Sequence, residues 1–205
     1  MKLSAKMGNV SKILHESSVI AHKYNDSYIL RWSVYDFMQE ILNEVRGARV
    51  LEVGPRTDFD HASLPMKDIM PPFFDLGKAL KELGNEYLSC DFSQNIPADY
   101  HCDFIDIPGE GVFDVIIALE VLEHSPKVWE ASTAFHRLLK PGGGLYVSTP
   151  FYVYHHDPYP DYWRFTEEGF EALLGKEFEL DITKILWKAD DGQRPVHFRV
   201  RGVSK

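Results

Sequence analysis

Apolar positions along the chain recur with two spacings, and each spacing predicts a different kind of element. Between Asn25 and Gly47, apolar residues recur every three or four positions, as in a helix with one buried face. Asp26 and Ser27 can help Asn25 to cap its first turn, and Gly47 can end it. Shorter apolar runs are typical of buried strands, and they occur at 50–53, 86–90, 113–118 and 145–149.

Helices are predicted between these runs, so strands and helices alternate over most of the chain. They cover 73–83, 127–139 and the segment from Thr166 to Leu174. This alternation predicts an α/β fold with a parallel sheet. Two last strand candidates, near 178–187 and 196–203, are separated by a turn-rich segment, which predicts a hairpin at one edge of the sheet.

Three further segments complete the expected organisation. A weaker apolar stripe at 10–24 predicts another helix, so we describe 1–47 as an N-terminal helical extension and 48–205 as the domain that contains the sheet. The extension could cap a pocket or form a contact between copies of the chain. The glycine-rich run 140–144 predicts a helix stop, and 101–104 predicts either the edge of a third strand or its loop.

Charge and cysteine content limit the kinds of partner. The chain has 205 residues and a formal net charge of −9, with no basic run, which argues against nucleic acid as the main partner. Cys90 and Cys102 lack the CxxC spacing and are expected to be reduced, buried thiols. Neither a signal pattern nor an apolar run of membrane-spanning length is present, so we expect a cytoplasmic protein without a membrane partner.

The run Arg49-Val50-Leu51-Glu52-Val53-Gly54 has the features of a strand that leads to a ligand site. Glu52 interrupts an apolar run, and Gly54 ends it. A glycine allows a sharp turn and a close approach of the backbone to a ligand, and ligands of doubly wound sheets bind beyond the carboxyl ends of the strands. The alternative is a core strand that simply ends at Gly54.

Four motifs along the chain belong together. They are Val50-Leu51-Glu52-Val53-Gly54; Asp91 after the second strand; Phe113-Asp114-Val115-Ile116-Ile117-Ala118-Leu119-Glu120-Val121-Leu122-Glu123-His124; and Leu138-Leu139-Lys140-Pro141-Gly142-Gly143-Gly144-Leu145-Tyr146-Val147-Ser148-Thr149-Pro150. The third and fourth, at their separation in this chain, are the most specific. With these four motifs the chain resembles the class I S-adenosylmethionine-dependent methyltransferases.

The resemblance implies a Rossmann-like sheet of seven mostly parallel strands, with an antiparallel last strand and helices on both faces. It also implies S-adenosyl-L-methionine as the cofactor and assigns roles by position. Glu52 and Gly54 would lie beside the methionine part, Asp91 would bind the ribose hydroxyls, and Glu120 would border both cofactor and acceptor. Asp103 and Phe104 would lie at the adenine edge, and Phe92, next to Asp91, is a further candidate for binding the cofactor. Each acid could instead be a solvated loop carboxylate.

Two stretches face the acceptor side in the topology that the resemblance implies. One is Glu123-His124, of which His124 is either near the pocket or a structural helix-start residue. The other is the aromatic segment 150–165, in which His155 or His156 could act as a base because imidazole titrates near neutral pH. Tyr159 and Arg164 are candidates for binding the acceptor.

Two other interpretations of this aromatic segment remain open. It could be a satellite hydrophobic cluster held by an Asp161–Arg164 pair. His155, His156 and Asp157 are metal-ligand types, but adjacent residues rarely point at one ion and no HxxxH spacing supports a site, so we expect no metal.

The segment after Gly54 departs from the pattern of the family, which usually has further glycines there. This chain has Pro55 and Arg56 instead, and Gly54 and Asp91 are 91 − 54 = 37 residues apart, against about 20 in an ordinary dinucleotide fingerprint. The excess lies in 55–72, and we interpret it as a loop that, with Arg56, clamps the cofactor. The alternative is that the loop replaces the cofactor.

The leading functional hypothesis is transfer of a methyl group to oxygen or nitrogen of a small metabolite or glycan intermediate. The rival is a degenerate methyltransferase fold that acts as a binding or scaffold subunit without catalysis. A protein or nucleic-acid acceptor is disfavoured, because no Asn-Pro-Pro-aromatic motif follows the fourth strand and the chain is acidic.

Overall fold

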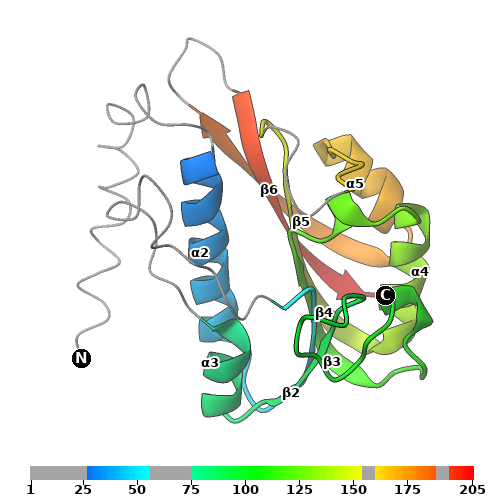
Figure 1. Cartoon of the computed structure of the whole chain (residues 1–205). Helices are drawn as coiled ribbons and strands as arrows, with labels where there is room; N and C mark the ends of the chain where they lie inside the picture. Colours follow the sequence, from blue (N-terminus) through cyan, green and yellow to red (C-terminus); the bar gives the residue numbers. More distant parts are fainter. Residues whose placement is uncertain (1–26, 56–74, 154–159, 188–193) are drawn as a thin grey trace.

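A six-stranded sheet forms the centre of the molecule, as a computed structural model shows (Figure 1). The structure describes residues 27–55, 75–153, 160–187 and 194–205. The helices are α2 (Ser27–Glu44), α3 (Leu76–Glu82), α4 (Ala131–Leu138) and α5 (Glu167–Leu174), with 3-10 turns η3 (Phe104–Asp106), η4 (Leu122–His124) and η5 (Val128–Glu130). The strands are β1 (Arg49–Val53), β2 (Glu86–Cys90), β3 (Phe113–Leu119), β4 (Leu139–Pro150), β5 (Phe178–Trp187) and β6 (Arg194–Ser204).

The strand order is β2-β1-β3-β4-β6-β5. Strands β1, β2, β3 and β4 pair in parallel, whereas β6 is antiparallel to both of its neighbours, β4 and β5. The α/β class, the mostly parallel sheet and the closing hairpin are therefore confirmed. Because β6 lies between β4 and β5, the hairpin contributes the edge strand β5 and its inner neighbour.

The described residues contain six strands, not the seven that the resemblance implies. Beyond β2 the described residues form an isolated parallel bridge, Cys90 with Tyr100, followed by η3. The carboxylate of Asp103 accepts a hydrogen bond from the backbone N–H of Ile105 at 3.3 Å. This local bond starts a tight turn where a further strand would run, so the loop alternative is the correct one for 101–104.

The helix stop predicted at 140–144 is confirmed, and the same run also forms part of β4. Helix α4 ends at Leu138, and Leu139 already pairs with Phe113 of β3. The register then shifts before Gly144 pairs with Val115. Gly142 has φ +76°, a conformation that glycine adopts readily, so the glycines form an irregularity within the strand.

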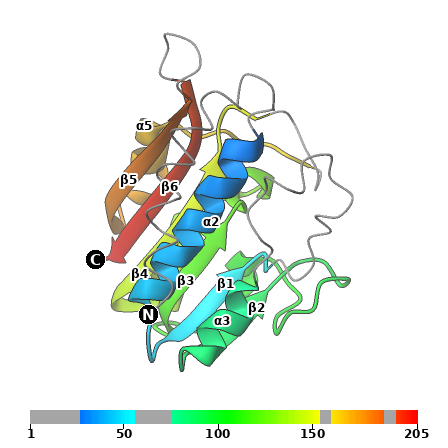
Figure 2. The same ribbon diagram turned by 90° about the vertical axis from the view of Figure 1, so that its left-hand side faces the viewer.

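Helices cover both faces of the sheet (Figure 1). Helices α4 and α5 pack on one face, over a core that includes Phe135, Phe170 and Phe198. Helices α2 and α3 cover the other, and Figure 2 shows α2 lying across the middle strands. The core on that face is made by Phe37, Ile41, Val45, Val50, Leu76, Leu80, Val115 and Ile117. Helix α2 therefore shares a core with the sheet, while the helix expected at 10–24 lies outside the described residues.

Candidate active site

Three parallel strands end side by side and bring Gly54, Asp91 and Glu120 to one edge of the sheet. Val53 pairs with Cys90 on one side and with Ala118 on the other. The N–H of Gly54 donates to the Cys90 carbonyl at 2.8 Å, which joins the turn after β1 to the end of β2. This is the edge at which open α/β sheets bind their ligands.

Gly54 has a conformation and a neighbour that no other residue type suits. Its φ is +68°, and a Cβ atom placed there would lie 2.9 Å from Cγ2 of Val121. A side chain would therefore be strained by the backbone and would collide with the turn after β3. Glycine at position 54 therefore lets the backbone turn sharply while it packs closely against Val121.

Glu52 is buried on the sheet face that α2 and α3 cover. Its Oε2 accepts a hydrogen bond from the Tyr87 hydroxyl at 2.6 Å. Burial raises the pKa of Glu52 to about 7; the Tyr87 bond opposes this rise and nearby Asp75 adds to it. One oxygen of Glu52 is therefore occupied within the protein, and its charge depends on pH near neutrality.

The other cofactor candidates near β2 differ in their contacts and in their exposure. Asp91 Oδ1 accepts from the Ser93 N–H at 2.7 Å and lies at the edge of the sheet. Phe92 is 70% exposed. Asp103 caps η3, and Phe104 is buried, with its ring stacked on Phe135 at 4.9 Å between centroids. The Phe104 side chain is thus part of the core.

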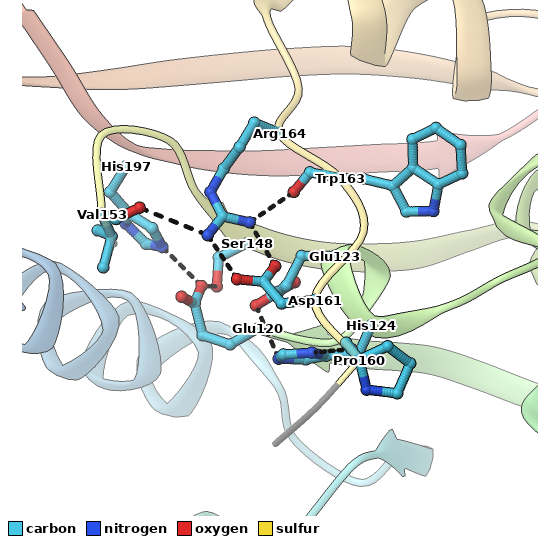
Figure 3. A network of polar contacts seen from close by, with 10 residues as sticks. All are labelled: Glu120, Glu123, His124, Ser148, Val153, Pro160, Asp161, Trp163, Arg164 and His197. Atoms are coloured by element: carbon cyan, nitrogen blue, oxygen red, sulfur yellow. Dashed lines mark hydrogen bonds and ion pairs between the residues drawn. The ribbon is translucent and has the colours of Figure 1, made fainter. Parts of the chain in front are cut away.

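Glu120 is held by a chain of polar contacts that spans four elements, and Figure 3 shows its contacts with Ser148 and His197. Its Oε1 accepts from Ser148 Oγ at 2.7 Å and lies 2.8 Å from Nε2 of His197. The other imidazole nitrogen, Nδ1, is 2.6 Å from Oγ of Ser33 on α2. His197 is 0% exposed, so this chain links α2, β6, the end of β3 and β4 inside the protein.

The surroundings of Glu120 favour its ionised form. Burial opposes the charge, but His197 and the Ser148 hydrogen bond outweigh it, and the pKa of Glu120 lies below its ordinary value. Its φ is +56°, which is rare for a residue with a side chain. Its second oxygen, Oε2, is buried without a hydrogen-bond partner among the described residues. The protein thus fixes an ionised carboxylate and leaves one of its acceptors unused.

Ser33, Ser148 and His197 were missed by sequence reasoning. Ser33 and His197 are 164 positions apart, and Glu120 and His197 are 77 apart, so no local motif connects them. In the β4–β6 register His197 pairs with Pro150, the last residue of the fourth motif, but the sequence alone does not reveal this register.

Glu123 has a different environment three residues further along. Its side chain is 0% exposed, and neither carboxylate oxygen has a hydrogen-bond partner in the described part of the chain. Nε2 of His124 lies 3.7 Å from its Oε1. Burial, and next the charge of Glu120, raise the pKa of Glu123 well above its ordinary value. Glu123 was expected on the acceptor side, but only His124 was predicted to bind the acceptor.

Residues 160–166, which we call the strap, run over η4. The N–H groups of Tyr162 and Trp163 both donate to the backbone carbonyl of Glu123, at 2.7 and 3.2 Å. The indole N–H of Trp163 donates to the Ser125 carbonyl at 2.7 Å, and Nδ1 of His124 lies 2.9 Å from the Pro160 carbonyl. These bonds fix the strap against the turn that carries Glu123 and His124 (Figure 3).

Arg164 forms the ion pair with Asp161 that we expect if this segment is a satellite hydrophobic cluster. Its two terminal nitrogens bind the two oxygens of Asp161, at 2.5 and 2.7 Å, and the Asp161 side chain is fully buried. The guanidinium also donates to the carbonyls of Trp163 and Val153. Arg164 therefore holds the strap together, and a two-pronged pair of this kind leaves it poorly available to an anionic ligand.

Four candidates from the sequence, Arg56, His155, His156 and Tyr159, lie outside the described residues. Among the residues that the structure does describe, no group of three His, Cys, Asp or Glu side chains is placed to hold a metal ion. Cys90 and Cys102 are free thiols, and Cys90 Sγ donates to the Cys102 carbonyl at 3.2 Å. No helix in the described part of the chain is long and apolar enough to cross a bilayer.

Comparison with known proteins agrees with this geometry. The model of a family described as "Methyltransferase domain" matches residues 23–172, more than half of the chain. The chain belongs to this methyltransferase family. The match begins before α2 and ends within α5, so it includes the strand edge, the strap, and Ser33, Glu120 and Ser148 of the Glu120 network, but not His197. The resemblance to class I S-adenosylmethionine-dependent methyltransferases is thereby confirmed.

Individual relatives are more distant. A ubiquinone biosynthesis O-methyltransferase of Chromobacterium violaceum is 27% identical over 154 residues, which cover 70% of this chain and 65% of that protein. A similar enzyme of Xanthomonas oryzae is 31% identical over 109 residues, which cover 52% of this chain and 44% of that protein. The matches thus span about half to two thirds of the length of these relatives.

A solved structure has the same fold at low sequence identity. An S-adenosylmethionine-dependent methyltransferase from Mesorhizobium loti aligns with a TM-score of 0.57 and 15% identity, covering 85% of this chain and 97% of that one. This similarity supports the Rossmann-like methyltransferase fold assigned above.

Proposed function

We propose that this methyltransferase family member uses S-adenosyl-L-methionine to methylate oxygen or nitrogen of a small molecule. The observation that carries the proposal is the convergence of Gly54, Asp91 and Glu120 at the carboxyl edge of three adjacent parallel strands. Family membership makes the cofactor the natural occupant of that edge. The names of relatives at low identity, ubiquinone biosynthesis O-methyltransferases, favour an oxygen acceptor.

The residues at the edge fit the chemistry of the cofactor. The turn at Gly54 has no room for a Cβ, so its backbone can approach a ligand closely. A carboxylate such as Asp91 can accept hydrogen bonds from both hydroxyls of a ribose. The unused, buried Oε2 of Glu120 offers one more acceptor at the same edge. Glu52 lies nearby, although Tyr87 occupies one of its oxygens.

Bound S-adenosylmethionine supplies an activated methyl group on a sulfonium ion. The protein then has three tasks: to align the acceptor atom with the methyl group, to accept its proton and to keep water out. The strap, with buried Asp161 and Phe165, and the turn η4 are the described elements suited to close the acceptor side. His124 and Arg164 would shape that side, while Arg56, His155, His156 and Tyr159 remain candidates from the sequence.

The acceptor class is inferred from charge and from the relatives. A net charge of −9 disfavours nucleic acid, and we expect a small metabolite or glycan intermediate as substrate. We also expect a cytoplasmic enzyme whose N-terminal helices could support a homo-oligomer, and we expect Arg56 and the 55–72 loop to clamp the cofactor.

Calorimetry with S-adenosylhomocysteine tests the cofactor site. We expect the full-length protein to bind it, and Asp91→Asn to weaken binding about tenfold or more, because hydrogen bonds to a charged acceptor contribute about 1.5–3 kcal/mol. Gly54→Ala should weaken binding as well. Gly142→Ala is the matched control, since Gly142 has φ +76° but nothing within 4 Å of a Cβ. Absence of binding by the wild-type protein would refute the proposal.

A second candidate, a catalytically inactive binding subunit, is favoured by the segment after Gly54. Pro55 lacks a backbone donor at a position where the cofactor would need one, and it is buried. S-adenosylhomocysteine binding without methyl transfer to any acceptor, in a broad screen and in cell lysate with labelled methyl donor, would support this candidate.

A further inference from the structure

Three buried carboxylate oxygens at the end of β3 have no hydrogen-bond partner among the described residues. They are Oε2 of Glu120 and both oxygens of Glu123. Leaving a buried polar group unpaired costs about 1–3 kcal/mol, and more for a charged group, so native structures rarely keep three together. A group from outside the described residues that donates hydrogen bonds would satisfy them.

Three of the charged groups near these oxygens are bound elsewhere or do not reach them. Arg164 is bound to Asp161 in the strap, and His197 of β6 is bound to Oε1 of Glu120. On η4, His124 approaches Glu123 only to 3.7 Å. Arg31 of α2 also lies close enough to Glu120 to lower its pKa. The two carboxyl groups would repel an anionic acceptor, whereas a hydroxyl or amino group would find several hydrogen-bond acceptors.

The surroundings of Glu120 and Glu123 also shift the pKa values of the two carboxyl groups in opposite directions. The His197 and Ser148 contacts keep the pKa of Glu120 low despite its burial, while burial beside Glu120 raises the pKa of Glu123. A pair of acids whose environments separate their pKa values is the usual arrangement for dividing roles between a fixed charge and a proton acceptor. A carboxylate with a raised pKa is the better base.

We propose that Glu123 is the catalytic base of the methyl transfer and that Glu120 Oε2 accepts a hydrogen bond from the same acceptor, which is therefore a hydroxyl or amine and not a carboxylate. The O–H or N–H bond breaks and its proton passes to the Glu123 carboxylate. The acceptor atom bonds to the methyl carbon as the S–CH₃ bond breaks and leaves the neutral thioether. This inference rests on the proposed function.

The test compares three probes that share one ring and differ in the reacting group: phenol, benzylamine and benzoate. Full-length wild type, Glu123→Gln, Glu123→Asp and the exposed control Glu110→Gln are assayed for transfer from labelled S-adenosylmethionine across pH. S-adenosylhomocysteine affinity is measured for each variant. Gln replaces a buried carboxyl with a neutral group of equal size, so retained affinity reports an intact fold.

We expect the wild type and Glu110→Gln to methylate phenol or benzylamine but not benzoate. Glu123→Gln should lower kcat by about 10²–10⁴-fold with S-adenosylhomocysteine affinity within about twofold, as expected for loss of a general base. In the wild type the rate should rise with pH as Glu123 loses its proton; that rise should be absent in Glu123→Gln and present, at lower kcat, in Glu123→Asp.

Four outcomes would overturn the inference. They are methylation of benzoate; no methylation of phenol or benzylamine by wild type that binds S-adenosylhomocysteine; an unchanged kcat and pH profile in Glu123→Gln; and loss of the pH-dependent rise only in a His155→Ala/His156→Ala double variant. Chelation adds a fifth: if EDTA abolishes activity and Mg²⁺ restores it, the two carboxyl groups are cation ligands instead. Failure of the wild type to bind S-adenosylhomocysteine would instead reject the proposed function itself.

Discussion

At the scale of single residues, Glu52 makes the stability of the protein depend on pH. Its pKa is raised from 4.5 to about 7 in the folded state, so the native state binds the proton more tightly than the unfolded chain. Stability therefore falls as pH rises from 4.5 through 7. One pKa unit corresponds to about 1.4 kcal/mol, so the effect is on the order of 3 kcal/mol.

Glu52→Gln should remove this contribution while its amide oxygen still accepts the Tyr87 hydroxyl. We expect the variant to lose less stability than the wild type between pH 5 and pH 8. Urea unfolding at a series of pH values measures the difference. Glu82→Gln, an exposed position on α3, is the control and should follow the wild type. Parallel pH profiles for Glu52→Gln and the wild type would show that Glu52 is not buried in this way.

His197 is the residue on which the ionised state of Glu120 depends. His197→Ala removes the partner of Ser33 and of Glu120 Oε1 and leaves a buried carboxylate less compensated, so we expect about 3–5 kcal/mol of lost stability. Glu120 contributes stability above pH 4.5 that is lost as pH falls through its lowered pKa. In the variant that pKa rises, so acid unfolding should begin at a higher pH.

His197→Gln is the informative companion variant. The Gln amide can donate a hydrogen bond to Glu120 even without contacting Ser33. We therefore expect stability, and resistance to acid unfolding, to recover in part. His101→Ala, at an exposed histidine whose Nδ1 lies 3.2 Å from the Ser93 carbonyl, should leave acid unfolding unchanged. If acid unfolding begins at the same pH in His197→Ala and in the wild type, the role assigned to His197 is wrong.

Local sequence could reveal some site residues and not others. Gly54, Asp91 and Glu120 follow short apolar runs and Glu52 interrupts one, so their positions at or near the strand ends were predictable. Ser33, Ser148 and His197 come together only when α2 and β6 pack beside β3, and such pairing depends on tertiary register that no local pattern encodes. Burial of Glu123 likewise depends on a strap almost forty residues later in the chain.

At the scale of elements, the strap depends on one ion pair. Arg164→Lys keeps the charge but loses the two-pronged contact with Asp161, and lysine cannot replace that geometry. We expect the backbone N–H groups of Tyr162 and Trp163, which bond to Glu123, to exchange about tenfold faster, since tenfold corresponds to about 1.4 kcal/mol.

Hydrogen exchange with mass spectrometry or NMR measures this change. Lys184→Gln breaks an ion pair with Glu167 that lies at the surface between β5 and α5, and such pairs contribute little. It should leave exchange in the strap unchanged. If Arg164→Lys also leaves it unchanged, the backbone bonds hold the strap without the ion pair.

The same scale shows why some elements were predicted well. Strands with continuous apolar runs and helices with a clear cap, such as α5 after Thr166, match the structure closely. Two segments were predicted only in part. The run 140–144 ends the helix as predicted but also forms strand, because β3 offers a pairing edge. For 101–104 strand edge and loop were both open, and the segment is a turn because the Asp103 side chain bonds locally.

At the scale of the whole molecule, two hydrophobic cores share one sheet. Phe37 of α2 anchors one face and Phe170 of α5 the other, and both are almost completely buried. Helix α2 is joined to the opposite end of the chain through Ser33 and His197 and through ion pairs of Glu40 with Arg199 and Arg201. These contacts make the sheet and both helical layers one cooperative unit.

We therefore expect Phe37→Ala and Phe170→Ala each to lower the free energy of unfolding by about 3–5 kcal/mol in a single transition. Trp32 on α2 reports the first face, while Trp129 and Trp163 report the second, so variants that retain one reporter group can be followed separately by fluorescence. The fluorescence curves should coincide with each other and with circular dichroism in urea. Separate transitions would mean that α2 belongs to a detachable N-terminal extension, because its core would then melt without the sheet.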